Sequence, residues 1–172
     1  GSEDSHGRAL WSLGSLVGAS GSPHLRCDAE ELFRAALPAT DRFTSPRAWA
    51  FTVLGIDAAL TRHPRDRRLG EALSRTSGRL FDLFRRGSAP DWPWCEPEVT
   101  YANATLPQAL LAAGTRQRDD RMIATGLRAL GWLLDLQRSS AGHFSPIGSN
   151  GFYRRGDVMA AFDQQPIEAG AT

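Results

Sequence analysis

Two kinds of helical segment alternate along the chain. In one kind, small or apolar side chains occupy almost every position, as in the uncharged run from Ala48 to Ile56. In the other kind, apolar residues such as Leu69, Leu73 and Leu80 form one stripe, and charged residues take the opposite side. The first pattern covers residues 6–18, 46–61 and 106–113, the second covers residues 25–37, 66–85 and 118–137, and a further helix begins near Pro166.

This alternation predicts the fold class. A helix that is apolar all round is buried on every side, whereas a helix with one apolar stripe lies outside a core. No segment has the alternating pattern of a β-strand. We therefore expect parallel inner helices, with Trp49, Phe51 and Leu110 buried, wrapped by an outer layer. The prediction is an all-α protein, a single α/α-toroid domain over residues 1–172 with about three and a half helical hairpins, which is an arc of a ring.

Antiparallel hairpins place the N-termini of all inner helices at one end of the molecule, which we call the mouth. Four segments lead into inner helices there, namely residues 2–8, 43–47, 91–104 and 162–168. Helix N-termini also present free N–H groups and positive dipole ends. The polar and aromatic side chains expected at the mouth are Glu3, Asp4, His6, Arg8, Arg47, Trp92, Trp94, Glu96, Tyr101, Asn103, Asp163, Gln164 and Glu168.

The segment 91–104 carries the densest set of these side chains. Trp92 and Trp94 offer indole faces on which a sugar can stack, and Glu96 offers a carboxylate for hydrogen bonding or proton transfer. The alternative is a loop whose tryptophans close the end of a helical core. A second segment, residues 142–156, contains four glycines and is too long for an ordinary turn. We expect it to form a lid or wall, with Asn150 and Tyr153 facing the ligand.

Helix capping is the alternative role for several polar residues of the mouth. Ser2 can cap a helix whose first turn is acidic, and Pro46 and Pro166 suit a first helical position. Glu168 then falls in the first turn, where a carboxylate is favourable. His6 alone is more often a surface histidine than a catalyst. Four polar segments on one rim nevertheless favour a binding site.

Composition excludes several function classes. The net charge of +1 provides no field that attracts nucleic acid or an anionic membrane. Cys27 and Cys95 form neither a disulfide framework nor a metal motif, so we expect no metal, no cofactor and a cytoplasmic location. No run approaches the roughly 18 apolar residues of a membrane span, and no signal-peptide pattern is visible, so we expect neither. The sequence stops inside a predicted helix, so we expect it to be part of a longer protein.

Several stretches resemble the signatures of a bacterial helical-toroid domain. The resemblance covers nearly the whole chain and rests on residues 2–11, 44–50, 91–94, 100–103, 143–153 and 162–168. That domain is labelled a glycosyltransferase, or occurs beside one, and belongs with the six-hairpin glycosidase-like toroids. The resemblance implies a carbohydrate ligand, and as a partner the missing part of the toroid, a second chain or a glycosyltransferase domain. Cys95 stands where an aromatic residue is usual and Ala102 where an aspartate is usual, so this copy is impaired if that aspartate is catalytic.

The sequence thus predicts a carbohydrate-active domain that binds, and in a glycoside hydrolase-like manner processes, a sugar at the mouth. Hydrolysis needs two carboxyl groups roughly 5–10 Å apart. One alternative is a non-catalytic carbohydrate-binding or scaffold module, and another is a sugar epimerase or isomerase that uses His6. A cyclase is disfavoured because the chain has no aspartate-rich or zinc-binding motif. The catalytic candidates are Glu3, Asp4, His6, Glu96, Asp163 and Glu168, and the binding candidates are Arg8, Arg47, Trp92, Trp94, Tyr101, Asn103, Asn150, Tyr153 and Gln164.

Overall fold

The structure is a computed structural model that describes residues 1–171, and it confirms the all-α class. Each predicted helix is present within a few residues of its expected bounds. The fifth helix is longer than expected and ends where Arg118 adopts a left-handed conformation, with φ of 58°. The elements are α1 (Glu3–Ala19), α2 (Pro23–Ala36), the 3-10 helix η1 (Leu37–Arg42), α3 (Pro46–Arg62), α4 (Arg67–Gly87), β1 (Glu98–Val99), α5 (Thr105–Gln117), α6 (Asp120–Leu136), β2 (Tyr153–Arg154) and α7 (Pro166–Ala171).

Side chains that bind free backbone N–H groups define the helix starts. Ser2, Ser22 and Ser45 each accept a hydrogen bond from the N–H three residues further on, at the starts of α1, α2 and α3. Asp66 and Asp119 cap α4 and α6 in the same way. These bonds satisfy donors that the helix itself leaves unpaired. The capping interpretation of the segments around Ser2 and Ser45 is therefore confirmed.

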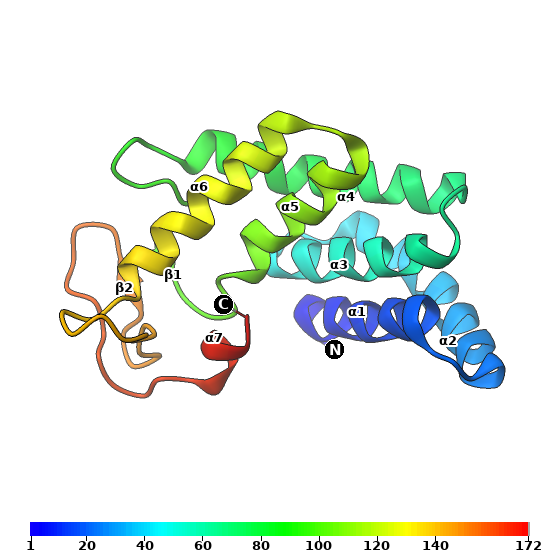
Figure 1. Cartoon of the computed structure of the whole chain (residues 1–172), viewed down its shortest axis with the longest axis horizontal. Helices are drawn as coiled ribbons and strands as arrows, with labels where there is room; N and C mark the ends of the chain where they lie inside the picture. Colours follow the sequence, from blue (N-terminus) through cyan, green and yellow to red (C-terminus); the bar gives the residue numbers. More distant parts are fainter. Residues whose placement is uncertain (172) are drawn as a thin grey trace.

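Helices α1 and α3 are parallel and lie in close contact along their length (Figure 1). Gly7 of α1 lies against Ala48 of α3, and two helical turns further along, Gly14 lies against Gly55. A Cβ atom added at Gly14 would lie 2.0 Å from the carbonyl oxygen of Gly55. The absence of side chains thus lets the two backbones approach closely. Both contacts run in the same direction along the two helices, which confirms their parallel orientation.

Helix α5 extends this inner layer on the other side of α3. Arg47, near the start of α3, donates a hydrogen bond to Asn103, just before α5. Arg116, at the end of α5, forms an ion pair with Asp57 in the second half of α3. Contacts at both ends in this order show that α3 and α5 are also parallel. The N-termini of α1, α3 and α5 therefore lie at one end, as the sequence predicts.

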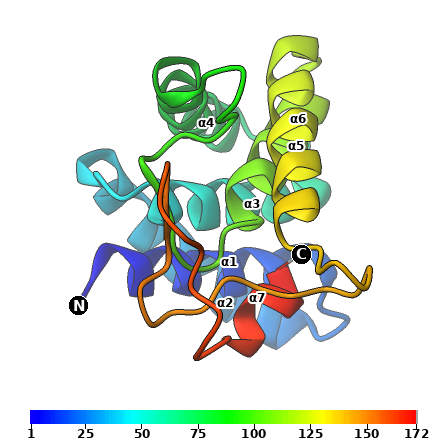
Figure 2. The same ribbon diagram turned by 90° about the vertical axis from the view of Figure 1, so that its left-hand side faces the viewer.

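Helices α2, α4 and α6 return antiparallel to α1, α3 and α5 and form the outer layer (Figures 1 and 2). Each buries one stripe against its inner partner, as Phe33 does on α2 and Leu80 and Phe84 do on α4. Helix α3 is buried over most of its surface because it has neighbours on three sides. Three hairpins in two layers are thus described, and their place in a closed toroid stays a prediction.

The long segments after α4 and α6 cross the mouth side by side (Figure 2). They are joined by the antiparallel pair β1–β2, in which Glu98 lies opposite Arg154 and Val99 opposite Tyr153. We expected no strand, and the prediction missed this ribbon because strands of two residues leave no alternating pattern. The ribbon ties the tryptophan-containing segment 91–104 to the glycine-containing segment 142–156.

The predicted inner-layer core is correct for two of its three residues. Phe51 and Leu110 are fully buried. Trp49 is only partly buried, contrary to expectation, because it lies near the start of α3 under the end of η1. Its indole N–H donates to the carbonyl oxygen of Phe43 at 2.9 Å, so the side chain fastens the connection that precedes α3.

Candidate functional site

Arg47 forms the centre of the polar cluster at the mouth. The residue is 4% exposed, and its guanidinium donates to three acceptors on the segment 96–103. The bonds run to the carbonyl oxygen of Tyr101 at 2.6 Å, to the Glu96 carboxylate at 2.7 Å and to the Asn103 side-chain oxygen at 3.3 Å. The same guanidinium lies over the Tyr101 ring, 4.6 Å from its centroid. Arg47 therefore holds the connection to α5 against the start of α3.

Glu168 brings the start of α7 to the same cluster. Glu168 is 2% exposed, and its carboxylate accepts hydrogen bonds from the backbone N–H groups of Ala102 and Asn103. The Asn103 side-chain amide also donates to it at 2.7 Å. Helix α5 has no capping side chain of its own, so Glu168 supplies a negative group beside its N-terminus. The capping alternative thus describes Glu168, although the capped helix is α5 rather than α7.

Asp4 and Tyr101 join α1 to the cluster. Tyr101 donates its hydroxyl proton to Asp4, and the Ser45 hydroxyl donates to the second Asp4 oxygen at 2.7 Å. Partial burial and then the bond to Asp4 raise the pKa of the Tyr101 phenol above its ordinary value, so the phenol stays protonated at neutral pH. Asp4 therefore bridges α1, α3 and the segment before α5.

Glu3 fastens α1 to the start of α3. Its carboxylate accepts from the backbone N–H groups of Ser45 at 2.7 Å and Thr44 at 2.8 Å. These bonds favour the charged form and lower the pKa of Glu3 below the ordinary value of 4.5. The carboxylate is fully engaged by protein donors, so its geometry suits a helix connection rather than a proton-transfer role.

We expect Glu3→Gln to lower the midpoint of thermal unfolding at neutral pH. The pKa of Glu3 is lower in the folded chain than in the unfolded chain, so its ionised form stabilises the fold above the unfolded value. That contribution is lost as the pH falls through the lower, folded pKa. Thermal unfolding followed by circular dichroism across pH should show the difference from wild type shrinking below pH 4.5. A difference that is constant with pH would contradict this role of Glu3.

His6 does not face the mouth. Its Nε2 lies 2.9 Å from the carbonyl oxygen of Ala36, and because a carbonyl can only accept, Nε2 carries the proton. The imidazole also meets the Phe43 ring edge-on at 5.2 Å. His6 thus connects α1 to the end of α2, and the expectation that it takes part in a site at the mouth is wrong for this structure.

Trp92 and Trp94 are part of the core. They are 3% and 0% exposed, and their indole N–H groups donate to the backbone carbonyls of Glu96 and Glu98. Trp92 packs at 4.9 Å and Trp94 at 5.9 Å from the Trp132 ring of α6. Neither ring leaves a face open for stacking. The prediction that they are sugar platforms is therefore corrected, and the alternative, closure of the helical core, describes them.

Apart from Glu168, the residues predicted on the segments 142–156 and 162–168 form a separate group. Asp163 accepts from the Ser149 hydroxyl, and Gln164 donates to Ser145 at 3.4 Å, so both bind the neighbouring segment 142–156. Tyr153 packs on Trp92 with ring centroids 5.4 Å apart. Asn150 is exposed. Within residues 1–171, the polar contacts of Asp163 and Gln164 join the segments 142–156 and 162–168 and do not reach the Arg47 cluster.

The mouth contains a cavity that the sequence did not predict. Its volume is about 240 Å³, and it lies between the N-terminal halves of α1, α3 and α5 and helix α7. The Arg8 guanidinium lies 4.3 Å over the Phe51 ring, and Trp11 stacks on the same ring at 5.8 Å. Arg8 and Trp11 are three residues apart in α1 and so share a face, and this spacing is the signal that could have added Trp11 to the predicted site. The lining residues are Arg8, Trp11, Phe51, Ala102, Thr105, Ile167 and Gly170.

Trp11 also borders a second cavity of about 690 Å³ that continues along α3 and α5 toward their C-terminal ends. This cavity reaches Gln108 and Thr115 on α5 and Asp57 on α3. Trp11 thus lines both cavities, which we together call the groove.

A larger cavity, about 770 Å³, lies at the opposite end of the molecule, between α4 and the ends of α3 and α5. Three of its arginines are already paired within the protein, Arg67 with Glu71, Arg75 with Asp41, and Arg116 with Asp57. Of the four lining arginines, only Arg65 forms no ion pair within residues 1–171, so little free positive charge remains for an anionic ligand. Its size alone does not make it the better candidate.

Two further properties can be stated for residues 1–171. Within that range, no three His, Cys, Asp or Glu side chains are grouped so that they could hold a metal ion. None of the helices described combines the length and the apolar character that crossing a membrane requires.

Comparison of the chain with protein-family models, with curated proteins and with solved structures found no match. The resemblance to a glycosyltransferase-associated toroid therefore stays a prediction, and the candidate site depends on the geometry described above.

Proposed function

We propose that this chain is a carbohydrate-binding part of an α/α toroid and that it holds a sugar in the cavity at the mouth. The observation that carries the proposal is the position of Trp11. Its ring is supported by Phe51 on one side and borders both cavities of the groove. Aromatic faces pack against the apolar C–H surface of a sugar, and a planar ring already fixed by a neighbour loses little freedom on binding.

Hydrogen-bonding groups near Trp11 suit the hydroxyls of such a ligand. Arg8 lines the smaller cavity and forms no ion pair within residues 1–171, so its N–H donors remain available. Gln108 lines the larger cavity and is exposed, and its amide can both donate and accept. A mostly apolar pocket with a few convergent polar groups is typical of small-molecule sites.

Binding is favoured over hydrolysis because the candidate acids are engaged by the protein itself. Glu96 pairs with Arg47, and Glu168 accepts three hydrogen bonds from the segment before α5. Glu3 and Asp4 hold the start of α3, and Asp163 binds Ser149. A hydrolase needs one carboxyl group that protonates the leaving oxygen and a second that faces the sugar. We therefore favour a non-catalytic carbohydrate-binding module over a hydrolase. We expect a glycosyltransferase domain as its partner.

The test begins with a glycan array probed with the wild-type chain, followed by calorimetry with the glycans that bind. Trp11→Ala is expected to weaken binding about fivefold to tenfold, because a stacked aromatic ring contributes about 1 kcal/mol or slightly more. Trp11→Phe should retain part of the affinity. Arg8→Gln should also weaken binding, since the amide has fewer donors and no charge.

Trp132→Phe is the matched control, because Trp132 packs on the buried Trp92 and lines neither cavity of the groove. Affinity is calculated per folded molecule, with the folded fraction taken from circular dichroism. A chain that binds no glycan, or a Trp11→Ala variant that binds as tightly as wild type, would refute the proposal. Conversion of a bound glycan to products would show that the chain is an enzyme and not a binding module.

A further inference from the structure

Arg8 is the one charged residue among those that line the smaller cavity at the mouth, and the others are apolar residues, a glycine and a threonine. Its guanidinium lies 4.3 Å over the Phe51 ring, so an aromatic face holds it in place. Arg8 is partly buried, and within residues 1–171 it forms no ion pair and no hydrogen bond. Removing a charge from water costs free energy that a charged partner normally offsets. The cavity therefore presents a positive charge that the described residues do not compensate.

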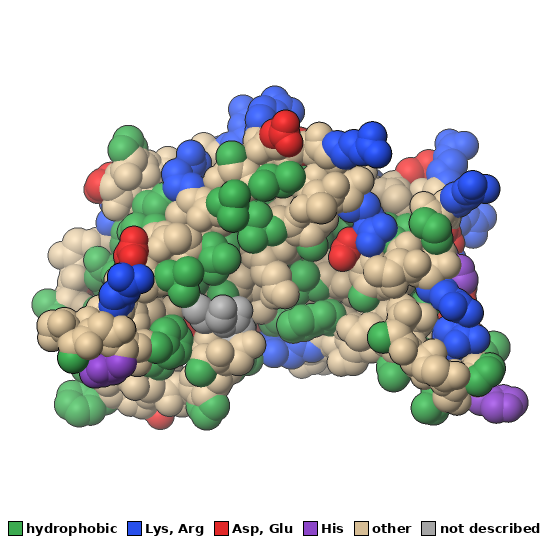
Figure 3. Space-filling model, in the orientation of Figure 1, with side chains coloured by type: hydrophobic (Ala, Val, Ile, Leu, Met, Phe, Trp, Pro, Cys, Tyr) green, Lys and Arg blue, Asp and Glu red, His purple; other side chains and the backbone are tan. Residues whose placement is uncertain are grey.

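The acids near the start of α5 are bound by donors of the protein. Glu168 of α7 accepts from the backbone N–H groups of Ala102 and Asn103 and from the Asn103 side chain, and Glu96 pairs with Arg47. The positive dipole end of α5 further offsets the charge of Glu168. Figure 3 shows the face of the molecule that carries α1 and α5, on which acidic side chains are scattered rather than gathered. No carboxylate lines the cavity.

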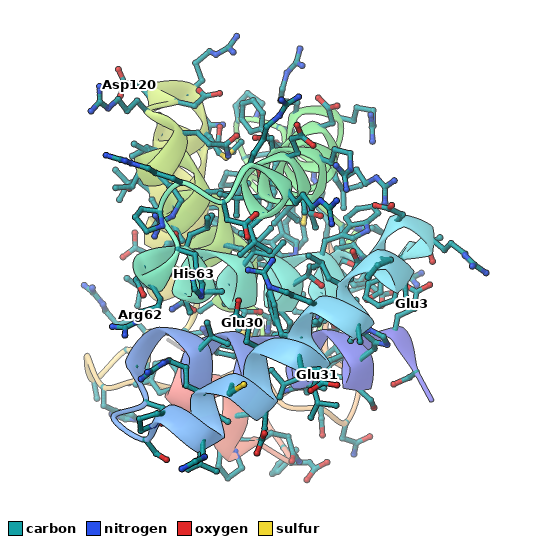
Figure 4. All side chains as sticks on the ribbon, turned by 90° about the vertical axis from the view of Figure 1, so that its right-hand side faces the viewer. Glu3, Glu30, Glu31, Arg62, His63 and Asp120 are labelled. Carbon is teal, nitrogen blue, oxygen red and sulfur yellow. The ribbon has the colours of Figure 1, made fainter. Side chains whose placement is uncertain are left out.

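The two acids of α1 are bound in the same manner. Asp4 precedes Arg8 by four residues, a spacing at which opposite charges can pair along a helix. Its oxygens instead accept from the hydroxyls of Tyr101 and Ser45. Glu3, which Figure 4 shows at the N-terminal end of α1, accepts from backbone N–H groups just before α3. Arg8 thus remains free for a ligand although an acid of its own helix lies one turn away.

We infer that the sugar bound at the mouth is acidic and that its carboxylate binds Arg8. This inference rests on the proposed function, because it names the class of sugar that the same cavity takes. A guanidinium presents its N–H donors in a plane that matches the two oxygens of a carboxylate. Arg8 and Trp11 share a face of α1 and both line the cavity, so the ring of a uronic acid can lie against Trp11 while its carboxylate meets Arg8.

The single positive charge favours a carboxylate over a phosphate. A phosphate monoester carries about −1.5 to −2 charges at neutral pH, so one arginine would leave part of that charge uncompensated. A carboxylate carries one negative charge, which Arg8 balances. A neutral sugar would leave Arg8 without a charged partner. The charge at the cavity therefore suits a uronic acid best.

The test is calorimetry with pairs of oligosaccharides that differ in one group. Each pair consists of a uronic-acid oligosaccharide and the neutral counterpart with a hydroxymethyl group in place of the carboxylate. The wild-type chain is expected to bind the acidic member about tenfold more tightly at neutral pH and low salt. The methyl ester of the acidic member should bind like the neutral one. Arg8→Gln should bind both members of a pair equally, and Arg8→Lys should keep part of the preference, because it keeps the charge but not the planar donors.

Arg62→Gln is the matched control. Arg62 is exposed near the end of α3, forms no ion pair within residues 1–171 and lines neither cavity of the groove. Figure 4 shows Arg62 and Glu3 at opposite ends of the molecule. This variant should keep the wild-type preference, with the folded fraction of every variant taken from circular dichroism. A preference that survives in Arg8→Gln, or that is lost equally in Arg62→Gln, would overturn the inference.

The remaining outcomes separate this inference from the proposed function. If acidic and neutral sugars bind equally well and Trp11→Ala weakens both, the acidic class is wrong and the carbohydrate-binding module stands. Tighter binding of a phosphorylated or sulfated sugar than of the uronic acid would also overturn the inference. A chain that binds no glycan would refute both.

Discussion

Arg47→Ala is expected to lower the free energy of unfolding by about 3–5 kcal/mol, because it breaks a buried ion pair and leaves its acceptors unpaired. Arg47 is 4% exposed, and its removal deprives Glu96, Asn103 and the Tyr101 carbonyl of their donor. The affected groups lie on one connection between α4 and α5. Urea denaturation followed by circular dichroism measures the loss.

Two further variants separate the charge of Arg47 from its volume. Arg47→Met keeps most of the packing but no donor, so it should remain strongly destabilised. Arg47→Lys keeps one charge but cannot reach three acceptors at once, and its loss should be intermediate. Glu96→Gln should lower the free energy of unfolding less in the Arg47→Met background than in the wild type. The difference between the two losses is the coupling energy, which should be about 0.5–3 kcal/mol. Equal stability of Arg47→Ala and wild type would show that the Arg47 cluster contributes nothing to the fold.

Much of the fold could be predicted from the sequence because the burial of a helix determines the spacing of its apolar residues. The uncharged run Ala48–Ile56 lies in the helix with neighbours on three sides, and the single stripe that includes Leu80 lies on an outer helix. The order and direction of the helices follow from that pattern. The β1–β2 ribbon could not be predicted, because a pairing of two residues between distant segments depends on tertiary contacts alone.

The candidate site was predicted only in its position. Asp4, Arg47, Tyr101 and Glu168 do meet at the mouth, as the parallel inner helices require. Composition alone does not reveal whether a carboxylate faces a ligand or a backbone N–H. The same limit applied to the indoles, since a buried tryptophan and a stacking tryptophan look alike in a sequence. Trp11 was missed because it lies within an apolar helix, where a tryptophan is expected to be core.

Gly14→Ala is expected to destabilise the protein by about 2–3 kcal/mol, although alanine is the better helix former. The new Cβ would lie 2.0 Å from the carbonyl oxygen of Gly55 and 2.6 Å from its carbonyl carbon. Both are backbone atoms, so no side-chain rotation can relieve the overlap, and α1 must move away from α3. For a domain of this size, such a loss lowers the midpoint of thermal unfolding by about 5–10 °C.

Gly70→Ala in the exposed part of α4 is the matched control. A Cβ atom at Gly70 has no neighbour within 4 Å, so only the helix propensity changes and the variant should be stabilised by about 0.5–1 kcal/mol. The same substitution in two helices should thus have opposite signs. Gly55→Ala should resemble Gly14→Ala, because its Cβ atom would lie 2.5 Å from the carbonyl oxygen of Leu10. If Gly14→Ala is instead as stable as Gly70→Ala, α1 and α3 do not pack backbone to backbone, and the parallel inner layer that forms the mouth must be revised.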